Sequence, residues 1–178
     1  YGVGFTLPLY AFEKVLNIKS ESTVYIVRHG VTHFLFICSS FFIYLLCLGL
    51  FKNKWIGWTT QLFYLFMPII WAHSFFNPKD IPFMALFAVN LYLLFRTQQV
   101  PSKKMYLLFG FFLGYLVSFR MMGIILIPLF LLLNSLAFFS IPNKKPITYR
   151  LFLVKHALFL MAFIIGVLFL WPFLWESP

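Results

Sequence analysis

Ionisable side chains are scarce in this sequence, and four residues that could do chemistry fall within one eight-residue stretch. That stretch contains, in chain order, His73, Asn77, Lys79 and Asp80. Asp80 is the single acidic residue between Glu21 and Glu176. A carboxylate in an external loop can bind a metal ion or take a proton from a substrate hydroxyl. The alternative is a helix cap, because the helix dipole favours Asp near a helix start.

Arg120 is a second candidate, because it lies between two apolar stretches. An arginine within the membrane or at its boundary is costly and is often functional. Its guanidinium can bind a phosphate through two parallel hydrogen bonds. Together with Lys79 it would form an anion site if both lie on the same side of the membrane. The alternative is a side chain that extends to the lipid headgroups.

The other histidines, the cysteines and Glu13 have simpler interpretations. His29 and His33 share a helix face at a spacing that can bind a metal ion, but no third ligand is near. Glu13 falls in an amphipathic segment, which favours a solvated position. Cys38 and Cys47 lie about 13 Å apart along one expected helix, which is too far for a disulfide.

The composition indicates which elements must position these residues. The 178 residues are 62% hydrophobic and 10% charged, whereas soluble domains carry about 25% charged residues. Apolar stretches near the length of a bilayer span recur, and they are apolar on every side. We therefore expect an all-α, polytopic transmembrane helical bundle rather than a soluble domain or a β-barrel. The formal net charge of +10 is explained by loop anchors and contacts with membrane lipids, so no nucleic-acid partner is expected.

The distribution of apolar residues predicts the segments of the bundle. Residues 1–30 mix apolar and charged side chains, which predicts an amphipathic helix on the membrane surface. A transmembrane bundle follows over 31–175, with about six spans at 31–51, 55–74, 81–95, 105–119, 121–139 and 156–175. The third and fourth are short. Either flanking apolar residues extend them, or their outer ends dip below the surface around a polar cavity.

The placement of Lys and Arg predicts the orientation. The loops 52–54, 96–104 and 140–155 contain most of the basic residues and should be cytoplasmic. The 73–80 loop, Arg120 and both ends of the chain should then face outward.

These residues resemble a known family. Residues 68–83, with the letters PIIWAHSFFNPKDIPF, are similar to the second external loop of polytopic glycosyltransferases with the C-type membrane fold. The nearest group is the family 39-like proteins, which include protein mannosyltransferases and aminoarabinose transferases. Three weaker similarities lie elsewhere in the chain, at Tyr1–Gly2, Gly110–Gly123 and Trp171–Trp175.

The resemblance implies transfer of a sugar from a polyprenyl-phosphate donor to an acceptor lipid, glycan or protein on the non-cytoplasmic face. Asp80 would be catalytic, by contacting the acceptor or a divalent metal ion, which is the one cofactor implied. Lys79 and Arg120 would bind the donor phosphate, and His73 and Asn77 would bind polar substrate groups or shape the loop. The family's usual catalytic acid lies in the first external loop. We therefore expect it before Tyr1, in a longer protein of which this chain is a piece.

Two other functions remain open at this point. One is a multi-pass transporter in which Asp80 and Arg120 form a coupling pair, although no internal repeat is visible. The other is a structural subunit of a membrane complex. For the enzyme, we expect an integral protein of the bacterial inner membrane with its site loop facing outward.

Overall fold

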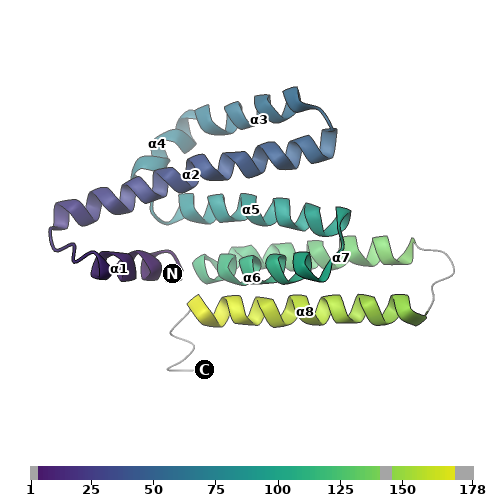
Figure 1. The fold of residues 1–178 in the computed structure, drawn as a ribbon. Helices are drawn as coiled ribbons and strands as arrows, with labels where there is room; N and C mark the ends of the chain where they lie inside the picture. The colour runs from purple at the N-terminus through teal and green to yellow at the C-terminus, as the bar shows by residue number, and fades with distance from the viewer. Residues whose placement is uncertain (1–3, 141–145, 171–178) are drawn as a thin grey trace. The chain divides into compact units, whose positions relative to one another are not determined.

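The computed structural model describes residues 4–140 and 146–170, and within these ranges the chain is helical with no strand (Figure 1). This confirms the predicted all-α class. The chain divides into two compact units, Val3–Tyr92 and a second unit from Leu93 onward. We call them the N-terminal and the C-terminal unit and describe each by itself.

The N-terminal unit contains α1 (Thr6–Val15), α2 (Glu21–Phe51), α3 (Lys54–Phe66), α4 (Pro68–Phe76) and most of α5 (Asp80–Gln99). Helix α1 ends before a short turn in which Asn17 has a left-handed backbone, with φ of 52°. Helix α2 then begins at Glu21, ten residues before the range predicted for the first span. At 31 residues it is about 46 Å long, so it exceeds the roughly 30 Å of a bilayer core.

Helices α3 and α4 divide a stretch for which the sequence predicts one continuous span, 55–74. The break falls at Met67, whose backbone is extended (φ −65°, ψ 112°). The following Pro68 explains it, because proline disfavours helical backbone at the preceding residue and is well placed at the start of a helix.

Helices α2 and α3 pack against each other through a small residue and through polar bonds. Gly57 of α3 lies against the Tyr44 ring, where an added Cβ would come within 2.9 Å of the ring. The Ser39 hydroxyl donates to the Phe36 carbonyl, and the Tyr64 hydroxyl donates to Ser39 over 2.8 Å. Such pairing is required of polar side chains in an apolar solvent.

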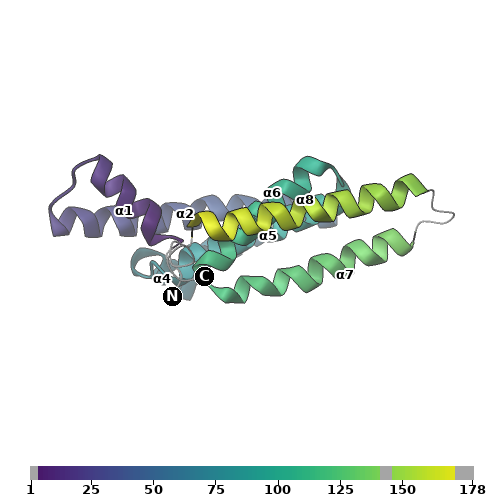
Figure 2. The same ribbon diagram turned by 90° about the horizontal axis from the view of Figure 1, so that it is seen from below.

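The C-terminal unit contains the end of α5, α6 (Lys103–Phe119), the 3₁₀-helix η1 (Met121–Ile125), α7 (Leu126–Phe139) and α8 (Pro146–Leu170). Helices α6 and α8 run side by side (Figures 1 and 2). Gly114 of α6 lies so close to α8 that an added Cβ would be 2.8 Å from the Val167 nitrogen. Beside this contact, the Phe159 ring stacks on the rings of Phe109 and Phe130, and these three side chains form an aromatic core.

Four of the helices in the described ranges are long and apolar enough to cross a membrane: Glu21–Phe51, Asp80–Gln99, Met121–Phe139 and Thr148–Phe169. Helix α5 has 20 residues rather than the 15 of the predicted third span. A helix continues through Arg96 and Gln99 because its backbone hydrogen bonds do not stop where the apolar run stops. The predicted number of spans and their orientation stay predictions. The Tyr1–Gly2 and Trp171–Trp175 similarities and the end of the span 156–175 lie outside the described ranges.

Candidate functional site

The turn between α4 and α5 is organised by the Asn77 side chain. Its Oδ1 accepts hydrogen bonds from the backbone N–H groups of Lys79 (3.2 Å) and Asp80 (3.0 Å). Its Nδ2 donates to Asp80 Oδ2 over 2.9 Å. One amide therefore caps the start of α5 and also orients the carboxylate there.

The rest of the predicted loop surrounds this turn. Asn77 Nδ2 lies 3.4 Å from His73 Nδ1, which is a longer and weaker contact than the one to Asp80. The side chains of His73, Lys79 and Asp80 are exposed. The structure thus places Asn77, Lys79 and Asp80 at this turn and His73 in the last turn of α4 before it. The capping role that was the alternative for Asp80 falls to Asn77, and the Asp80 carboxylate stays exposed.

Arg120 belongs to the C-terminal unit, where it separates α6 from η1. Its backbone is extended (φ −151°, ψ 135°), its N–H donates to the Leu116 carbonyl, and its own carbonyl accepts from Gly123. The side chain is half-buried. The anion site predicted for Arg120 and Lys79 joins residues of different units, and it stays a prediction.

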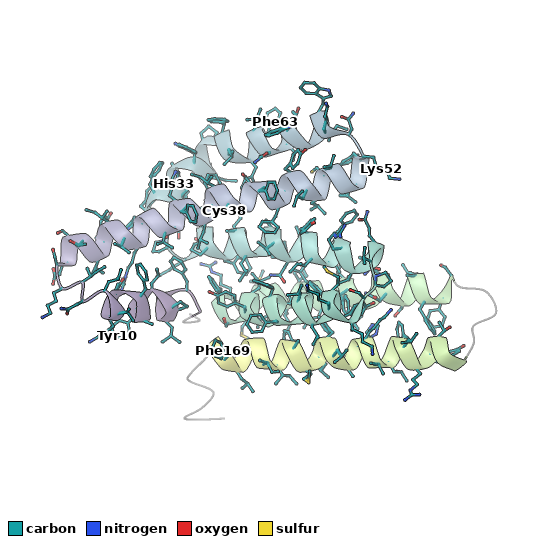
Figure 3. All side chains as sticks on the ribbon, viewed as in Figure 1. Tyr10, His33, Cys38, Lys52, Phe63 and Phe169 are labelled. Atoms are coloured by element: carbon teal, nitrogen blue, oxygen red, sulfur yellow. The ribbon has the colours of Figure 1, made fainter. Side chains whose placement is uncertain are left out.

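Two histidines of α2, His29 and His33, form hydrogen bonds to α4 (His33 is labelled in Figure 3). His29 Nδ1 bonds to the Phe75 carbonyl, so that nitrogen must carry the proton. His33 Nδ1 lies 2.8 Å from Ser74 Oγ, which already donates to the Trp71 carbonyl. His33 therefore donates as well, and its ring stacks on Phe75 at 4.2 Å. Sequence reasoning paired these histidines with each other; the structure gives each a partner on α4.

Glu13 corrects another expectation, since it is buried rather than solvated, with 6% of its surface exposed. Its two carboxylate oxygens accept from Arg28 Nε and Nη2 over 2.7 and 2.8 Å. The Arg28 hydrogen bonds lower the pKa of the Glu13 carboxyl, while burial acts in the opposite direction. This bidentate pair joins α1 to α2 close to His29. The amphipathic pattern gave no signal for it, because the pair depends on the turn at Asn17.

Comparison with known proteins identifies the chain's relatives. Residues 17–173 match the family described as dolichyl-phosphate-mannose-protein mannosyltransferase. The chain belongs to this family. No curated protein and no solved structure matches it.

Membership of the mannosyltransferase family confirms the resemblance drawn from residues 68–83. Together with the apolar helices, it identifies the chain as a membrane glycosyltransferase of the mannosyltransferase type. Both the Asp80 turn and the Arg28–His33 segment of α2 lie within the matched region. The transporter and scaffold alternatives have no comparable support.

The divalent metal ion implied at Asp80 stays a prediction. Among the described residues, no group of three or more His, Cys, Asp and Glu side chains could hold one. Asp80 has Asn77 and His73 as neighbours, and no second carboxylate joins them on this turn. We therefore assign no chemistry at Asp80 to a metal.

Proposed function

We propose that this mannosyltransferase-family chain transfers a sugar from a polyprenyl-phosphate donor to an acceptor hydroxyl on the non-cytoplasmic face of the membrane. The observation that carries the proposal is the Asn77-oriented carboxylate of Asp80, which lies exposed at a helix start within the matched region. The predicted orientation from the basic loops supports an outward-facing loop.

The transfer needs a base and an anion site. In the proposed step, the acceptor oxygen forms a bond to the anomeric carbon while the bond from that carbon to the donor phosphate breaks. Asp80 accepts the hydrogen bond of the attacking hydroxyl and takes up its proton. Lys79, next to it, contributes positive charge toward the departing phosphate.

The N-terminal unit also offers an apolar surface suited to a lipid tail. A cavity of about 840 Å³ lies along α3 and the start of α4, with walls that include Leu62, Phe63, Phe66, Met67 and Ile70. Helix α4 leads from this cavity to His73 and the Asp80 turn within one to two helical turns. A polyprenyl chain in the cavity would bring its phosphate toward that turn, which supports a lipid-linked donor over a water-soluble one.

The test is a transfer assay on the full-length protein in membranes, with a radiolabelled polyprenyl-phosphate sugar. We expect Asp80→Asn to lower the transfer rate by about 100-fold or more, because general bases contribute on the order of 10² to 10⁴. The matched control is Glu21→Gln, which removes an exposed carboxylate in the first turn of α2. Near-normal transfer by the Asp80 variant, at equal membrane insertion, would remove Asp80 from the reaction.

A further inference from the structure

The C-terminal unit has a polar cavity that the transfer reaction does not use. It occupies about 220 Å³ where α5 ends, α6 begins, α7 ends and α8 begins. Its polar wall is formed by six side chains: Thr97, Gln98, Tyr106, Asn134, Thr148 and Lys155. This wall differs from that of the cavity along α3, which is almost wholly apolar.

Three of these six side chains already have hydrogen-bond partners within the protein. The Tyr106 hydroxyl donates to Asn134 Oδ1, and Asn134 Nδ2 donates to the Phe130 carbonyl over 2.8 Å. Thr97 donates to the Leu94 carbonyl over 2.7 Å. Tyr106, Asn134 and Thr97 are each at most 5% exposed. These three residues therefore define the shape of the cavity. A ligand would have to bind to the other polar groups of the wall.

Two side chains of α8 can donate hydrogen bonds to a ligand in the cavity. Lys155 and Thr148 line the cavity, and neither the ammonium nor the hydroxyl has a hydrogen bond or an ion pair to a described residue. The ammonium lies 5.9 Å from the centre of the Tyr106 ring. The two residues are seven positions apart, so they share a helix face, and a lysine side chain leans toward the helix start and therefore toward Thr148. A cation and a hydroxyl that converge without a counter-charge suit an anion.

The location and the size of the cavity narrow the choice of anion. It lies at helix ends that also carry Arg96, Lys103, Lys104 and Arg150, so it belongs to the basic end of the bundle. Basic pockets between helices on the cytoplasmic side of a membrane suit anionic lipid headgroups. At about 220 Å³ it is smaller than the roughly 300 Å³ of ordinary small-molecule sites, which suits a phosphate headgroup better than a nucleotide or a whole sugar-phosphate donor. Phe138, Leu151 and Phe152 complete the wall and suit acyl chains.

We propose that this cavity binds the phosphate headgroup of an anionic phospholipid, through the Lys155 ammonium and the Thr148 hydroxyl. The bound lipid would join the ends of α5, α6, α7 and α8. The site does not depend on the proposed transfer reaction, and it can be tested without measuring sugar transfer.

The experiment uses the full-length protein, purified in detergent and titrated with phosphatidylglycerol or phosphatidylcholine, with bound lipid counted by native mass spectrometry. We expect Lys155→Gln to weaken phosphatidylglycerol binding about tenfold, the size of one charge-assisted hydrogen bond. Arg150→Gln is the matched control: it removes the same charge from the same helix, at an exposed residue that does not line the cavity. We expect it to change binding less than about threefold.

A second variant keeps the test decisive if Lys155→Gln fails to fold. Thr148→Val keeps the side-chain shape and should weaken phosphatidylglycerol binding about threefold, as expected for one lost hydrogen bond. Equal losses in the Lys155 and Arg150 variants would overturn the proposal, because they would indicate diffuse attraction to basic residues. Equal binding of phosphatidylcholine, or displacement of the lipid by millimolar inorganic phosphate alone, would also overturn it.

Discussion

The two units of this chain solve the same packing problem in different ways. In the N-terminal unit, side-chain hydrogen bonds and one ion pair join neighbouring helices, as at Ser39–Tyr64, His33–Ser74 and Glu13–Arg28. In the C-terminal unit, α6 and α8 approach so closely that glycines meet backbone, and aromatic rings fill the space beside them. Within a bilayer the hydrophobic effect does not distinguish a helix from a lipid tail, so close packing and polar bonds must do so.

This difference has a functional consequence. Hydrogen bonds between helices are directional, and those from α2 hold α4 in a defined position. The Asp80 turn begins where α4 ends, so its position is defined as well. In the C-terminal unit, glycine contacts fix the separation of α6 and α8, while a hydrogen bond from Tyr106 to Asn134 joins α6 to α7 beside the polar cavity. The Asp80 turn therefore lies in the unit whose helices are joined mainly by polar bonds, and the proposed lipid site lies in the unit where close glycine contacts accompany such a bond.

The largest expected effect tests the close packing of α6 and α8. In Gly114→Leu the added atoms would meet the backbone of Phe163 and Val167, which cannot move aside as a side chain can. We expect a loss of about 3 kcal/mol in unfolding free energy, which is the upper range for overpacking. Thermal unfolding in detergent measures it. The matched control is Gly30→Leu, because Gly30 has no atom within 4 Å of the added Cβ. Equal losses in the two variants would refute a special role for the glycine contact.

A smaller effect should come from the ion pair that joins α1 to α2. The pKa of Glu13 is lowered below its usual 4.5, so the pair is fully formed above that pH. Its stabilising contribution is lost as the pH falls through the lowered pKa. We expect the α1 amides to lose protection from hydrogen exchange below pH 4.5, after correction for intrinsic rates. In Glu13→Gln the protection of α1 should not change over this range, and a transition of the same size there would show that another group is responsible.

The smallest expected effect measures how much one hydrogen bond between helices contributes to the free energy of unfolding. Tyr64→Phe removes the hydrogen bond to Ser39 and keeps the ring. We expect a loss of about 0.6 kcal/mol, the average for such bonds inside membranes. Tyr25→Phe serves as the control, because Tyr25 is 60% exposed on the same bundle. A loss above about 2 kcal/mol would show that hydrogen bonds between helices contribute far more to the stability of the N-terminal unit than we infer.

Much of the candidate site could be predicted from the sequence, because it is local. His73, Asn77, Lys79 and Asp80 lie within eight residues, and Asn and Pro in such a stretch form turns by short-range contacts alone. The Asn77–Asp80 bond spans three residues. The ion pair of Glu13 and Arg28 spans fifteen residues around a left-handed turn, and no periodicity rule reports such a contact.

The sequence by itself determined that this protein is an all-helical membrane protein, and it placed four candidate site residues within eight positions. The apolar composition places the chain in a lipid bilayer. Because lipid tails cannot form hydrogen bonds, the backbone groups must bond to one another, as they do in a helix. Only the tertiary structure decided which helices approach each other and which polar groups they pair. Gly114 against α8 and Lys155 beside Tyr106 are examples, because each depends on the rotation of one helix against another. Hydropathy carries little information about that rotation when a helix is apolar on every side.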